Sequence, residues 1–159
     1  MKIDFALREL HRSEHKLALT LSALAARHKT DHEIHHVALD LADWSNNHLC
    51  ELAAAGTRYG LDLNAAPRTE ALTTPVQEKL SELLGHRPEP ALVLLMDLRH
   101  LHRVAAGVSV DWELLAQGAQ AVTDPELLAL TQRCHPQTLR QLRWTNAMLK
   151  VLAPQVLAS

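Results

Sequence analysis

Carboxylates and imidazoles occur at several places where this sequence is otherwise apolar at helical spacing. Glu14 lies among leucines, and His48 and His135 occupy similar positions in two later segments. Glu113 and His102 lie at the edge of a further apolar stripe. An unpaired carboxylate in a core costs several kcal/mol or takes up a proton, so such groups need partners. Carboxylate and imidazole are common ligands of Fe, Mn and Zn, and we predict a metal site of Glu14, His48, Glu113 and His135.

The elements that would position these groups are long amphipathic helices. Placing residues at 100° intervals gives each segment one apolar face. This pattern predicts four long helices over residues 4–28, 31–59, 90–122 and from 125 onward, and a short helix over 75–84.

Helix ends are indicated by capping and turn residues. Thr30 and Glu33 form a capping box after a turn near Lys29, which separates the first two helices. Gly60 is placed to end the second helix in a left-handed conformation. Asp124 as N-cap, followed by Pro125, opens the last helix. Thr74 and Gln77 form a second capping box, which starts the short helix.

The connection over residues 61–89 is much longer than neighbouring antiparallel helices need. We therefore predict an all-α fold: an antiparallel four-helix bundle with one long crossover between the second and third helices. Residues 1–159 would form a single domain. The first helix is expected to run antiparallel to both the second and the fourth.

Four of the polar residues are predicted to share one level of this bundle. Glu14, His48, Glu113 and His135 each lie 11 residues from the helix end expected on the same side of the molecule. This is about 16 Å at a rise of 1.5 Å per residue. Simple up-and-down connectivity would place them at different levels.

The architecture and the site placement resemble the ferritin-like di-iron carboxylate superfamily. That family carries Glu on the first and third helices and Glu-x-x-His on the second and fourth. Glu14 and Glu113 match the lone glutamates, while Ser45-Asn46-Asn47-His48 and Gln132-Arg133-Cys134-His135 match the paired motifs without their glutamates. The chain would be a divergent member with an incomplete ligand set. The resemblance implies one Fe, Mn or Zn ion and redox or oxygen-linked chemistry.

The alternative is a metal-free helical scaffold that acts through protein–protein interaction or homo-oligomerisation. His48 and His135 would then bond to nearby hydroxyls, and Glu14 would pair with His11 one turn away. The candidate hydroxyls are those of Ser45, Thr131 and Thr138.

Other polar groups are predicted at the surface. His32 and His36 lie almost opposite the apolar face of their helix, as solvated residues do. Trp144 falls near Arg140 and Arg143 and indicates a homodimer or protein-partner contact through this helix. A kink at Pro136 would instead rotate Trp144 inward.

Composition narrows the class of protein. The 159 residues are 47% hydrophobic and 21% charged, with a net charge of −2, which is typical of a globular protein that contacts neither nucleic acid nor membrane. No signal-peptide pattern opens the chain, and Cys50 and Cys134 show no CxxC spacing, so we expect a cytoplasmic protein. No nucleophile–base pair, phosphate loop or cofactor fingerprint is visible, and whether the protein is an enzyme stays open.

Overall fold

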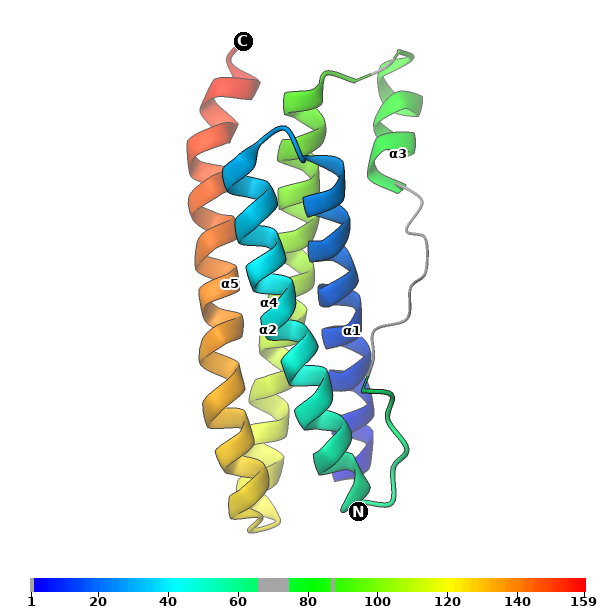
Figure 1. The fold of residues 1–159 in the computed structure, drawn as a ribbon, viewed down its shortest axis with the longest axis vertical. Coiled ribbons are helices and arrows are strands. Elements are labelled where there is room, and N and C mark those ends of the chain that lie inside the picture. Colours follow the sequence, from blue (N-terminus) through cyan, green and yellow to red (C-terminus); the bar gives the residue numbers. More distant parts are fainter. Residues whose placement is uncertain (1, 66–74, 87) are drawn as a thin grey trace.

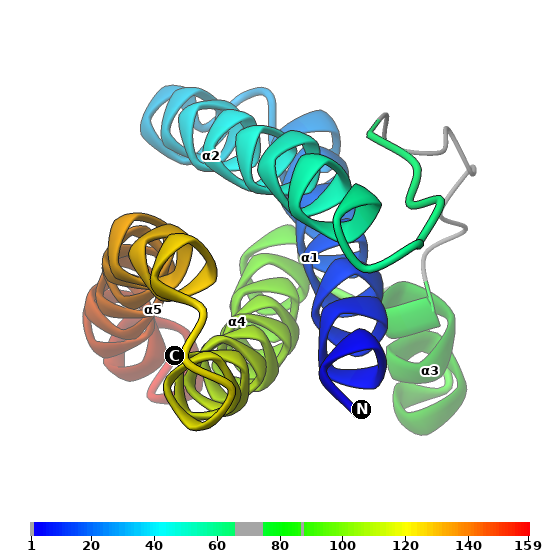
Figure 2. The same ribbon diagram turned by 90° about the horizontal axis from the view of Figure 1, so that it is seen from below.

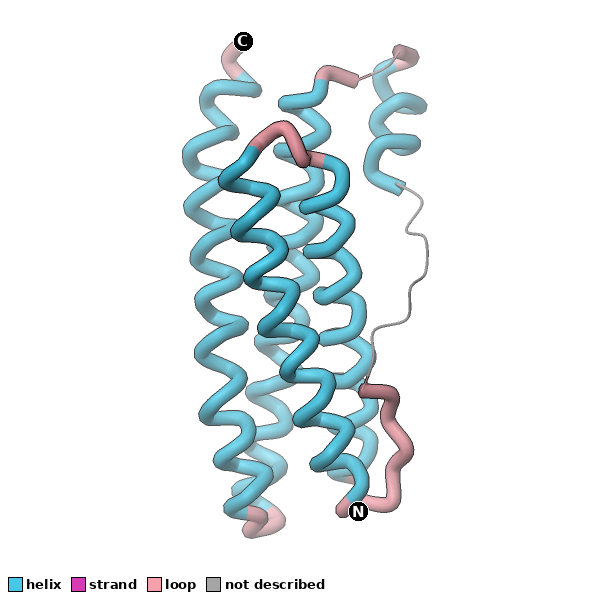
Figure 3. Tube along the Cα trace, viewed as in Figure 1, coloured by secondary structure: helices cyan, strands magenta, loops and turns pink. Residues whose placement is uncertain are grey.

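The computed structural model describes residues 2–65, 75–86 and 88–159, which contain five α-helices and no strand. The helices are α1 (Ile3–Arg27), α2 (His32–Thr57), α3 (Pro75–Leu84), α4 (Pro90–Ala121) and α5 (Pro125–Leu157). The prediction of an all-α protein is confirmed for these residues (Figure 3). The predicted helix limits agree with the observed ones to within two residues.

The four long helices lie side by side, and α3 lies next to the start of α4 (Figure 1). α2 returns to the end of the molecule where α1 begins, whereas α4 starts at the opposite end. The chain between α2 and α4 therefore joins opposite ends, and α5 runs in the same direction as α1. The expectation that the first and fourth long helices are antiparallel is wrong, because both start at the same end.

Side-chain caps fix two of the turns. The Asp31 carboxylate accepts a hydrogen bond from the Ile34 backbone N–H at 3.2 Å, so Asp31 is the N-cap of α2 in place of the predicted Thr30. Asp124 caps α5 as predicted, accepting from Leu127 N–H at 3.0 Å. Gly60 has the predicted positive φ, at 71°. The capping box at Thr74 lies outside the described residues.

The core is built from the apolar faces of the long helices. α1 packs closely on α2 and on α4, and α5 packs on α4, whereas α2 and α5 approach each other at few places (Figure 2). Fully buried side chains include many leucines and Trp112. Each such side chain contributes about 1.5–3 kcal/mol through removal from water. No helix in the described ranges is both long and apolar enough to cross a membrane.

Several contacts between α2 and α5 are polar. Gln141 donates from Nε2 to the Leu41 carbonyl and to the Ser45 hydroxyl, both at 3.0 Å. Arg133 pairs with Glu51 at 3.1 Å. Side chains of α5 thus reach α2 by hydrogen bonding where the helices do not pack closely.

Candidate functional site

A chain of hydrogen bonds crosses the middle of the core. Glu14 Oε1 accepts from Trp112 Nε1 at 2.9 Å and lies 2.7 Å from His48 Nδ1. His48 Nε2 lies 2.7 Å from Gln137 Oε1. These four residues, here called the polar layer, come one each from α1, α2, α4 and α5. Glu14, His48 and Trp112 are buried, with at most 1% of their surface exposed.

The polar layer holds His48 in its charged form. Both ring nitrogens face an oxygen, and only the imidazolium can donate from both nitrogens. Burial by itself would lower the pKa of His48. Hydrogen bonds with Cys134 and Glu14, together with the charge of Glu14, overcome this and raise the pKa from 6.5 to about 10. Glu14 and His48 therefore form a buried ion pair.

His135 and Glu113 lie in a different place. His135 Nε2 is 2.9 Å from the Ser109 hydroxyl, and His135 Nδ1 is 3.9 Å from Glu113 Oε2. The Glu113 side chain is 59% exposed and also accepts from Gln117. The structure thus brings the four predicted ligands together as two pairs, Glu14 with His48 and Glu113 with His135.

The angular position of each residue explains this separation. Trp112 and Cys134 take the buried positions on α4 and α5. The residue that follows each of them, Glu113 or His135, is turned by about 100° away from the core. His135 was placed on the core face because it aligns with Leu128 and other residues that are themselves only half-buried.

The donors of His48 are used by protein groups in this arrangement. Both His48 nitrogens are engaged, so no ring lone pair is left for a metal in this conformation. Within the described ranges, no group of three or more His, Cys, Asp or Glu side chains could hold an ion. The metal site of Glu14, His48, Glu113 and His135 stays a prediction.

Cys134 lies against the polar layer but is not an activated thiol. It is 3% exposed, contacts Glu51 Oε2 at 3.5 Å and interacts with His48. Burial raises the pKa of the Cys134 thiol, so that it stays protonated at neutral pH. Cys50 is exposed, with its sulfur 3.6 Å from the Ala65 carbonyl.

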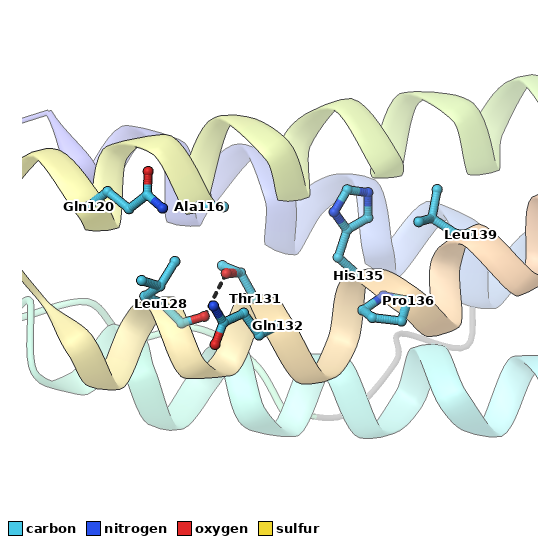
Figure 4. Close-up of a pocket in the computed structure, with 8 residues that line it drawn as sticks. All are labelled: Ala116, Gln120, Leu128, Thr131, Gln132, His135, Pro136 and Leu139. Carbon is cyan, nitrogen blue, oxygen red and sulfur yellow. Dashed lines mark hydrogen bonds between the residues drawn. The ribbon is translucent and has the colours of Figure 1, made fainter.

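A groove runs along the outer side of α4 and α5 beside His135 (Figure 4). Its volume is about 300 Å³. The imidazole of His135 lies at one end and projects toward α4, near Pro136 and Leu139. Side chains of Ala116, Gln120, Leu128, Thr131 and Gln132 line the rest. Most of this lining is apolar, with Gln120 at the end away from His135 and Gln132 near the middle, beside Thr131 (Figure 4).

The remaining polar candidates are at or near the surface. His32 and His36 are exposed, with stacked rings 6.4 Å apart, as expected of the outward face of α2. His11 bonds to the Asn64 carbonyl at 2.6 Å and does not pair with Glu14. Trp144 is half-buried and packs against the core, while Arg140 and Arg143 are exposed.

Three residues that take part in these hydrogen bonds were missed from the sequence. Trp112 was treated as purely apolar, although its indole N–H needs an acceptor when it is buried. Gln137 and Ser109 carried no signal of their own. Ser109 lies four residues before Glu113 and therefore shares a helix face with it. This spacing is the pattern from which Ser109 could have been found.

Comparisons with protein-family models, with curated proteins and with solved structures found no match for this chain.

Proposed function

We propose that this protein is a metal-free helical scaffold that acts by binding a protein partner or a second copy of itself. The observation that carries this proposal is the polar layer. It contributes one residue from each long helix and uses both His48 nitrogens within the protein.

Leucine-rich helix faces can slide past one another with little loss of contact. A buried ion pair cannot, because a shift leaves charged groups without partners at a cost of about 3–5 kcal/mol. One polar residue per helix therefore favours a single alignment of all four, much as a polar core position fixes the register of a coiled coil. A rigid, uniquely aligned bundle suits a protein that presents a surface.

We also infer a ferritin-like arrangement, with two antiparallel hairpins joined by a long crossover. The opposite placement of the end of α2 and the start of α4 supports this inference (Figure 1). The competing function is the binding of one Fe, Mn or Zn ion for redox or oxygen-linked chemistry. Glu14 Oε2 favours that function, because this buried atom has no hydrogen-bond partner among the described residues.

Metal analysis separates the two functions. For protein purified without an affinity tag, we expect no stoichiometric metal and the same melting temperature with and without a chelator. A ligand that binds only the folded state would raise the melting temperature by mass action. His36→Ala serves as a control, since it removes an exposed histidine that could bind metal adventitiously. Stoichiometric metal, with a chelator effect that His48→Ala abolishes and His36→Ala retains, would establish the metal centre instead.

We place the partner contact on the face of α5 that carries Arg140 and Arg143. Reversing both charges (Arg140→Glu with Arg143→Glu) is expected to shift sedimentation of a self-associated species toward the monomer, because like charges would then face the contact. Helicity should not change, as both side chains are exposed. A wild-type chain that sediments as a monomer at every concentration would exclude self-association.

A further inference from the structure

Ser109, His135 and Glu113 lie next to one another on the α4–α5 surface. The Ser109 hydroxyl lies 2.9 Å from His135 Nε2, within hydrogen-bond reach of a base. Glu113 Oε2 lies 3.9 Å from His135 Nδ1. Ser109 and Glu113 are one turn apart on α4, and His135 reaches them from α5.

The order of these groups selects one tautomer of His135. A carboxylate beside Nδ1 favours a proton on Nδ1, which leaves the lone pair on Nε2. That lone pair faces the Ser109 hydroxyl and can accept its proton. This is the division of roles found in Ser-His-acid triads, with nucleophile, base and orienting carboxylate in sequence.

The groove beside His135 offers a place for a substrate (Figure 4). Ala116, Leu128, Pro136 and Leu139 make its lining mainly apolar. The side-chain amide of Gln132, one turn before His135 on α5, lines the same groove and can donate to a carbonyl oxygen. Gln120 lies about 16 Å from Ser109 along α4 and is too distant for this role. The Ser109 backbone N–H is inside helix α4 and is used by the helix, so the Gln132 amide is the donor this groove offers.

We propose that the hydrogen-bonded pair of Ser109 and His135, at the edge of this groove, hydrolyses small apolar carboxylic esters, with Ser109 as nucleophile, His135 as general base and Glu113 as a positioning residue. This activity goes beyond the scaffold role and does not depend on it. Without a pair of backbone amides at the reacting oxygen, turnover is slow.

The reaction has two balanced halves. Ser109 Oγ forms a bond to the ester carbonyl carbon as its proton moves to His135 Nε2. The bond between that carbon and the alkoxy oxygen then breaks, and the proton passes from Nε2 to the leaving alkoxide, which departs as an alcohol. Water, losing a proton to Nε2, attacks the acyl group on Ser109. The carboxylic acid leaves, and the proton on Nε2 returns to Ser109 Oγ.

The test uses the full chain and p-nitrophenyl acetate, with the acetylated residue located by mass spectrometry of peptides. We expect a transient acetyl group on Ser109 and a loss of hydrolysis above background of about 100-fold or more in Ser109→Ala and in His135→Gln. Ser22→Ala and His36→Gln, which alter exposed residues on other faces, should keep the wild-type rate. Circular dichroism checks that each variant is folded.

The role of Glu113 has a separate readout. Glu113→Gln is expected to lower kcat with little change in KM, and Glu113→Asp should recover part of the loss, because the carboxylate orients His135 without contacting the ester. If Ser109→Ala hydrolyses the ester as fast as the wild type, the activity belongs to solvent-exposed imidazoles and the proposal is overturned. An acetyl group found on residues other than Ser109 would overturn it equally.

Discussion

Replacing Glu14 with glutamine is expected to lower the free energy of unfolding by about 3–5 kcal/mol at neutral pH. The change keeps the shape of the side chain and an oxygen that can accept from Trp112. It removes the charge that faces His48 Nδ1 at 2.7 Å. The imidazolium then either stays buried without a counter-charge or gives up its proton. Urea unfolding followed by circular dichroism measures the loss.

Glu113→Gln is the matched control, since it makes the same chemical change one residue beyond Trp112. Glu113 is 59% exposed, and its replacement should alter stability by no more than about 0.5 kcal/mol. Combining Glu14→Gln with His48→Gln puts two neutral amides in place of the ion pair and should recover part of the stability. A loss below about 1 kcal/mol in Glu14→Gln alone would mean that the ion pair does not stabilise the fold.

Stability is expected to fall as the pH rises from about 6.5 toward 10. The pKa of His48 is raised from 6.5 to about 10 in the folded protein, so the folded state binds this proton more tightly than the unfolded chain. The resulting stabilisation is fully present below pH 6.5 and is lost as the pH approaches the folded value. The slope of the loss is at most about 1.4 kcal/mol per pH unit, because one proton is released. Denaturant titrations at a series of pH values measure it.

The change in unfolding free energy reports mainly on His48 between about pH 6.5 and 9. At higher pH the Cys134 thiol and the Tyr59 phenol add losses of the same sign, because burial raises the pKa of both groups. The free energy of unfolding of His48→Gln should not change with pH within this range. Nitrogen NMR at about pH 8 should find one imidazole that keeps two N–H protons. A wild-type protein whose stability does not change across this range would show that His48 is neutral in the fold.

The helices and much of the core were predictable because they follow from local patterns. The spacing of leucines located each helix, and Gly60, Asp124 and Pro125 marked ends that the structure confirms. The prediction that Glu14 and His48 are buried was also correct, since both lie between leucines that are buried.

The pairing of side chains across helices was less predictable. The buried face of α5 is lined partly by threonine, cysteine and glutamine, so the apolar pattern of this helix is weak. The predicted core face is therefore displaced by about one residue from the observed one. His135 was therefore assigned to the core, and its contact with Ser109 was missed. Glu14 was expected to pair with His11 or a metal, whereas the partner that the fold supplies is His48. Which group faces which depends on rotations of whole helices, and a periodic pattern fixes these only coarsely.

The direction of α5 has a mechanical consequence. Residues near the two labelled ends of the chain lie at opposite ends of the long axis, because α5 runs the same way as α1 (Figure 1). A 33-residue helix is about 50 Å long, so objects attached at the two ends would be held about that far apart. Tension between the attachment points would pull α1 and α5 along their lengths in opposite directions. The bundle would be loaded in shear, in which many side-chain contacts must yield together, and would behave as a stiff spacer.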